Sequence, residues 1–252
     1  MSRATADKAV SVYLFGKPKI SRIRFFGGEP LLRFRLLKHV VESNPGTAFS
    51  FPTNGTLLDG RVQAFLREHP AIEVMTSRVP GQKLPNLLVS VTIEPPRAAD
   101  VAKRTAMLLK RGLNRLNFLP AFFVRWSRAE LGELSRSLGV TAGLLRAWRE
   151  RGKPLEVRNL STRNPVPLFN HGMVVDVNGD VFSSNAALCV PFQGLRRTLL
   201  LGNLSRSEKI DWAKASAFDW DGIFRESLDP RVYRDTMAVN DILTDFVERL
   251  AA

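Results

Sequence analysis

The stretch Arg22–Leu32, RIRFFGGEPLL, constrains the fold more than any other part of the sequence, because it predicts a buried strand, a tight turn and a helix in direct succession. Pro30 suits the first helical position, where its missing N–H costs nothing. Gly27 and Gly28 let the backbone turn sharply or lie close against a ligand. Glu29 then stands at the carboxyl end of a strand, where α/β folds place ligands and where a carboxylate can accept hydrogen bonds from an amine. Two glycines and a proline are also common in turns that bind nothing. The stretch alone therefore leaves open whether this turn is structural or binds a ligand.

Strand and helix patterns alternate along the first 160 residues, which predicts a parallel sheet with helices packed on it. The predicted helices are Thr5–Phe15, Leu31–Ser43, Asp59–His69, Ala98–Arg111, Ser127–Leu138 and Ala142–Arg151. The predicted strands after the first stretch are Ala48–Phe51, Glu73–Met75, Leu87–Ile93, Arg115–Phe118 and Leu155–Leu160. Because a helix opens the chain, we predict an α/β fold of the partial (β/α)6 TIM-like barrel type that lacks its first strand.

The motif RFFGGEPLL, with PTNGT at Pro52–Thr56, closely resembles the ends of the second and third strands of the radical S-adenosylmethionine (SAM) superfamily. The resemblance extends to about Leu204 and covers most of the chain. It implies reductive cleavage of SAM by a [4Fe–4S] cluster, giving a 5′-deoxyadenosyl radical that abstracts hydrogen from a substrate. The protein's part in such chemistry is to orient SAM and shield the radical, while a separate reductant supplies the electron.

The resemblance also assigns residues that contact SAM. In the superfamily the GGEP backbone and glutamate bind the amino group of SAM, and this role falls here on Gly27, Gly28, Glu29 and Pro30. Further strand-end positions around the SAM cavity are Asn54, Thr92 and Asn117, the last within reach of the ribose. Thr92 and Glu94 match the superfamily's pattern of a small polar residue and an acid only loosely.

The superfamily binds its cluster through three cysteines in a C-x-x-x-C-x-x-C loop upstream of GGEP, since thiolates hold such clusters. The only cysteine here is Cys189, so this chain cannot build that site and is expected to be inactive without those cysteines. We expect the first strand and its cysteines to lie outside this chain, either because of a misplaced start codon, which we favour, or through natural loss. A lone cysteine is more often a small buried hydrophobic residue than a ligand.

The pattern changes at Pro165, which predicts a barrel region at 1–164 and a second region at 165–252. Met173–Val177 and Asp180–Phe182, joined by Asn-Gly, predict a β-hairpin. With the later LLLGNL, this segment resembles the start of the SPASM/twitch-type region of peptide-modifying radical SAM enzymes. Serines 183 and 184 stand where that region has cysteines, so we expect no auxiliary cluster and a hairpin that packs on the barrel or closes its mouth. The aromatic tail is expected to pack as helix against the barrel.

The histidines lack the spacing of a zinc site, and His171 is the only one expected near the cavity. The net charge of +13, from 37 Lys and Arg against 24 Asp and Glu, favours an acidic substrate such as a peptide, or nucleic acid. No nucleic-acid-binding motif accompanies the charge. The absence of a long apolar run or a signal peptide predicts a cytoplasmic protein without a membrane segment. Two alternatives to the enzyme stay open: a cluster-less relative that acts as a binding or scaffold protein, and a basic nucleic-acid-binding protein.

Overall fold

The computed structural model of the chain describes residues 1–16, 22–78, 84, 86–161, 173–206, 210–212, 214 and 219–252. His171 lies outside the described residues. The chain forms two compact units, of which unit 1 comprises Met1–Phe51 and Leu168–Ser227, and unit 2 comprises Pro52–Pro167 and Leu228–Ala252. Each unit is described by itself, and the boundary expected near residue 164 stays a prediction.

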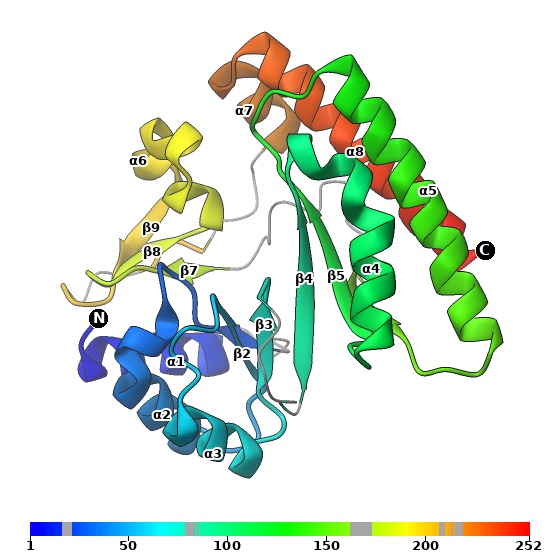
Figure 1. Cartoon of the computed structure of the whole chain (residues 1–252). Coiled ribbons are helices and arrows are strands. Elements are labelled where there is room, and N and C mark those ends of the chain that lie inside the picture. Colours follow the sequence, from blue (N-terminus) through cyan, green and yellow to red (C-terminus); the bar gives the residue numbers. More distant parts are fainter. Residues whose placement is uncertain are drawn as a thin grey trace. The chain divides into compact units, whose positions relative to one another are not determined.

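Six strands form a sheet whose order follows the chain, and the strand pairs with a defined register are parallel (Figure 1). The strands are β1 (Ile23–Arg24), β2 (Phe49–Thr53), β3 (Glu73–Thr76), β4 (Leu87–Ile93), β5 (Arg115–Pro120) and β6 (Glu156–Val157). This arrangement confirms the predicted α/β class. No pairing within the described part of the chain closes the sheet, so the partial barrel stays a prediction.

The first strand and the turn after it are held within unit 1 by the neighbouring strand. β1 pairs with β2, and the Phe25 N–H extends the ladder by donating to the Ser50 carbonyl at 2.9 Å. The ring of Phe25 stacks on that of Phe49 with centroids 5.6 Å apart. The helix expected at Leu31–Ser43 begins as a 3-10 turn, η1 (Pro30–Arg33), and continues as α2 (Phe34–Glu42). The GGEP turn is therefore attached at both ends to regular structure.

The predicted hairpin is present and belongs to a small antiparallel sheet of β7 (Val174–Val175), β8 (Asp180–Phe182) and β9 (Leu200–Asn203). The Asp176 carboxylate accepts the Asn178 and Asp180 N–H groups at 2.8 and 3.2 Å. Gly179 has a φ of +87°, and a Cβ there would lie 2.5 Å from the hydroxyl of Ser205. Only glycine therefore fits this turn.

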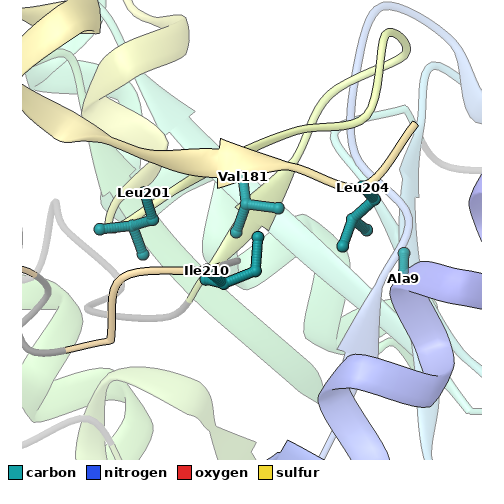
Figure 2. Packing of buried hydrophobic residues seen from close by; sticks show 5 residues of the cluster. All are labelled: Ala9, Val181, Leu201, Leu204 and Ile210. Carbon is teal, nitrogen blue, oxygen red and sulfur yellow. The ribbon is translucent and has the colours of Figure 1, made fainter. Parts of the chain in front are cut away.

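One face of the small sheet packs against α1 (Arg3–Gly16), as Figure 2 shows. Ala9 of α1 joins a buried apolar cluster. The other members are Val181 on β8, Leu201 on β9, and Leu204 and Ile210 after β9. The Lys8 ammonium adds a 3.3 Å hydrogen bond to the Leu204 carbonyl. The hairpin thus anchors on a helix of its own unit. The rest of this region is η4 (Asn185–Leu188), η5 (Val190–Leu195), α6 (Arg196–Leu199) and α7 (Trp220–Ser227).

Unit 2 also contains six helical segments within its described residues. They are α3 (Gly60–Glu68), η2 (Pro95–Asp100), α4 (Val101–Lys110), α5 (Arg128–Glu150), η3 (Arg158–Ser161) and α8 (Pro230–Ala251). The two helices expected at Ser127–Leu138 and Ala142–Arg151 are one helix, α5. Its buried stripe continues past Gly139, and the packing of that stripe outweighs the weak helix propensity of one glycine. The predicted capping box between Ser127 and Glu130 is confirmed.

The aromatic core of unit 2 joins its last helix to its sheet. Phe118 of β5 and Phe246 of α8 are fully buried and meet edge to face at 4.9 Å between centroids. Among the residues that the structure describes, no helix has both the length and the apolar character needed to cross a membrane.

Candidate functional site

Glu29 caps the 3-10 turn that follows it. Its Oε1 accepts the Leu31 N–H at 3.3 Å, and its backbone carbonyl accepts the Leu32 N–H at 3.1 Å. The residue is half-buried in an extended conformation, with φ −134° and ψ 103°. Pro30 occupies the first position of η1, as its fixed φ and missing N–H favour. The local sequence therefore fixes the carboxylate beside the two glycines that precede it.

Gly27 and Gly28 are both exposed, and a Cβ built on either would meet no atom within 4 Å. Gly27 has a φ of +145°, a conformation that residues with a side chain rarely adopt. Gly28 has no such φ, so neither its backbone nor its surroundings exclude a methyl group. The fold therefore explains Gly27 but gives no reason for Gly28.

The parallel pairing of β4 with β5 places polar residues side by side in unit 2. Ser90 is the register partner of Asn117, and Thr92 lies two residues further along β4 on the same face. Their side chains make no hydrogen bond to any other part of the chain that the structure describes. We call these three residues the polar face. The alternate residues of both strands, including Val91 and Phe118, are buried on the opposite face.

Sequence reasoning found Thr92 and Asn117 of this face but missed Ser90, which is 9% exposed. The signal was present in LLVSVTI, where two hydroxyl residues are spaced two apart in an otherwise apolar strand. Such spacing puts both hydroxyls on one side of a strand. Ser90 is therefore an additional candidate for ligand contact.

Asn54 immediately follows β2 and closes a local turn. Its Oδ1 accepts the Thr56 N–H at 2.9 Å and the Thr56 hydroxyl at 2.6 Å. Gly55 takes the left-handed conformation that such a turn needs, with φ +82°. The structure thus gives Asn54 a turn-forming role. Its assignment to SAM, like that of the other predicted site residues, stays a prediction.

The residues present do not fit a [4Fe–4S] cluster, which needs several thiolates. The sequence holds one cysteine, Cys189, which is half-buried with its Sγ 3.7 Å from the Asn185 carbonyl. Burial raises the pKa of this thiol, which disfavours the thiolate. Ser184 caps η4 through the Ala186 N–H at 3.2 Å. Within the described ranges, three or more His, Cys, Asp or Glu side chains nowhere gather as metal ligands.

A charged cluster that sequence reasoning missed lies where β3, β5 and β6 begin and where the short β6 passes into η3. The Glu73 side chain is 1% exposed and accepts from the guanidinium of Arg115 at 3.1 Å and from that of Arg158. Arg115 also binds Glu156, with 2.5 Å between Nε and Oε2, and this hydrogen bond raises the pKa of the guanidinium. Ligands of α/β folds bind at the other end of the strands, so we assign this cluster to stability.

The chain matches no family model and no curated protein. Its fold is similar to that of solved structures at low sequence identity. Native anSMEcpe with bound AdoMet is 14% identical, with a TM-score of 0.70 over 100% of this chain and 88% of that chain. Native anSMEcpe with bound AdoMet and Cp18Cys peptide is also 14% identical, with a TM-score of 0.65 over 100% of this chain and 89% of that chain. These likenesses show a shared fold.

Proposed function

We propose that this chain is a radical SAM-type protein that binds S-adenosylmethionine. Two independent lines support the proposal. The GGEP and TNG motifs resemble those of the superfamily, and the fold is similar to that of anSMEcpe, an anaerobic sulfatase-maturating radical SAM enzyme with bound AdoMet. AdoMet is S-adenosylmethionine, so sequence and fold point to the same ligand.

The GGEP turn suits the amino acid part of SAM. The half-buried Glu29 carboxylate is fixed by its hydrogen bond to the Leu31 N–H, so a ligand ammonium would meet a positioned anion. Gly27 and Gly28 expose their backbone with open space beside it, as close approach of a ligand requires. These residues would bind and orient the ligand's charged end.

In unit 2, taken by itself, the polar face suits a ribose. Ser90, Thr92 and Asn117 offer two hydroxyls and one amide, groups that donate to and accept from ribose hydroxyls. Ser90 is the most buried of the three at 9% exposed, so a hydrogen bond between its hydroxyl and a ligand would be the best shielded from water.

The observation that carries the proposal is the GGEP turn, in which the Glu29 carboxylate is held by the Leu31 N–H beside two exposed glycines. The test is SAM binding by isothermal titration calorimetry to the wild type and to Gly28→Ala. We expect an unchanged melting temperature and at least tenfold weaker binding, because the methyl group fills the space that the ligand needs. Gly194→Ala is the matched control, since a Cβ there also meets nothing within 4 Å. Equal SAM affinity in wild type and Gly28→Ala, or no SAM binding by the wild type, would refute the proposal.

We assign no reductive cleavage of SAM to this chain, because its residues do not fit the cluster. For a substrate we propose a peptide or another acidic molecule. The net charge of +13 suits an acidic partner, and one of the similar structures carries a bound peptide. The single cysteine favours a second candidate function, a protein that binds SAM or a peptide without radical chemistry. The complete reading frame around this chain would separate the two.

A further inference from the structure

The outer edge of β5 is only partly covered by another strand. β6 pairs with Arg115 and Leu116, and the chain then turns into η3. The next backbone groups of β5 that point to this side are the N–H and carbonyl of Phe118, since alternate residues of a strand direct these groups to opposite sides. At this level no strand of the described structure continues the ladder on that side.

The side chain of Asn159 takes the place of the missing strand. Its Oδ1 accepts the Phe118 N–H at 2.8 Å, and its Nδ2 donates to the Phe118 carbonyl at 2.9 Å. Asn159 is 5% exposed, so both bonds are shielded from water. An amide offers the same donor and acceptor as a peptide group. Aspartate has no donor, and a serine hydroxyl is too short to span both groups.

We propose that Asn159 is a positioning residue for Asn117. The two bonds hold the backbone of Phe118, whose ring is fixed on the other face against Phe246. β4 pairs with β5 through Pro120, and Asn159 holds the other edge of β5 beyond the last residue that β6 pairs, so Asn117 keeps its side chain on the polar face beside Ser90. The inference rests on the proposed function, because Asn117 matters only if the polar face binds the ligand.

The first test needs no ligand. Hydrogen exchange measured by mass spectrometry on the peptic fragment that contains Phe118 should be faster in Asn159→Ala than in the wild type. Ser161→Ala is the matched control: Ser161 lies on the same 3-10 turn, but its hydroxyl bonds to the Arg158 carbonyl. The control should exchange at the wild-type rate. Unchanged exchange in Asn159→Ala overturns the proposal, and this result does not depend on whether SAM binds.

The second test is a double-mutant cycle on SAM affinity with Asn159→Ala and Asn117→Ala. Loss of one hydrogen bond to the ligand weakens binding about tenfold, and loss of the positioning residue should cost roughly three- to tenfold. The double variant should bind no more than about twofold more weakly than Asn117→Ala alone, because both changes act on the same contact. If the loss of SAM affinity in the double variant equals the product of the losses in the two single variants, Asn159 does not act through Asn117. If Asn159→Ala does not fold, Asn159→Asp takes its place in the cycle, because aspartate keeps the side-chain volume.

Discussion

Ser90 and Asn117 are direct neighbours across the β4–β5 pair, and their side chains lie on the same face of the sheet. The opposite face carries buried apolar side chains such as Val91 and Phe118, and the face of Ser90 and Asn117 also includes the apolar Leu88 and Leu119. A buried strand usually reads as a continuous apolar run. Ser90 and Asn117 interrupt this run with side chains that have no hydrogen-bond partner in the part of the chain that the structure describes, and a bound ligand would supply one.

We predict that Ser90→Ala weakens SAM binding about tenfold while leaving the free energy of unfolding unchanged, because the lost hydroxyl has no protein partner. Ser137 is a contrasting buried serine, since its hydroxyl accepts the Ala102 N–H and donates to the Ala99 carbonyl. Ser137→Ala should cost about 1 kcal/mol of stability and leave SAM affinity unchanged. Calorimetric titration and urea denaturation on both variants measure the two quantities. A loss of stability in Ser90→Ala with unchanged SAM affinity would contradict a ligand role for Ser90.

The sequence predicted the elements that depend on local pattern. Leu87–Ile93 was predicted with the observed bounds, and the capping box at Ser127 was predicted with both its partners. Helix α5 was divided wrongly at Gly139, because its continuity depends on packing across the glycine rather than on propensity. Sequence patterns predict an element correctly where the interactions that form it join residues close together in the sequence.

Features that depend on distant residues were missed. Glu73 meets Arg115 and Arg158 only because the sheet brings the starts of β3 and β5 close to the short β6 and the turn after it, and their separation in sequence exceeds forty residues. Asn159 replaces a strand in the ladder of Phe118, which no motif signals. The GGEP residues were found because they lie in one short turn. Ser90 could have been found from its spacing to Thr92.

The charged cluster should contribute strongly to the stability of unit 2. Glu73→Gln leaves Arg115 and Arg158 with a weaker partner, and we expect it to lower the free energy of unfolding by about 2 kcal/mol. Breaking a fully buried pair costs more, but these two guanidinium groups keep about a quarter of their surface exposed. Glu156→Gln, at a side chain 44% exposed, should cost less than about 1 kcal/mol. Urea denaturation that ranks the two variants in the opposite order would reject this assignment.

Acid should destabilise unit 2 partly through Asp235. Burial pushes the pKa of this carboxyl upward, but hydrogen bonds from the Trp126 N–H and the Arg125 guanidinium, with the charge of Arg125, outweigh burial and lower the pKa. Because the pKa is lower in the folded state, the stabilisation is fully present above the ordinary carboxyl pKa of about 4 and is lost as pH falls through the folded pKa. Asp235→Asn should therefore show a shallower loss of stability between about pH 5 and pH 2. Parallel curves for the two proteins would exclude this role.

The small sheet depends on its apolar contact with α1. Leu201 is 4% exposed within the cluster of Figure 2, so Leu201→Ala should lower the free energy of unfolding by about 3 kcal/mol. Val177 lies at the hairpin tip and is 66% exposed, and Val177→Ala should change stability by less than about 0.5 kcal/mol. Thermal and urea unfolding measure both. Similar effects of the two substitutions would show that the cluster does not hold the sheet.

The central claim is that the carboxylate of Glu29 binds the ammonium group of S-adenosylmethionine. The most direct measurement is SAM affinity of Glu29→Gln by calorimetric titration, because glutamine keeps an oxygen that can accept the Leu31 N–H but replaces the second, anionic oxygen with a neutral NH2 group. Glu42→Gln, at an exposed carboxylate on α2, is the matched control. Loss of a charge-assisted hydrogen bond should weaken binding roughly tenfold to a hundredfold in Glu29→Gln, while the control binds like the wild type. Equal affinity of wild type and Glu29→Gln would contradict the claim.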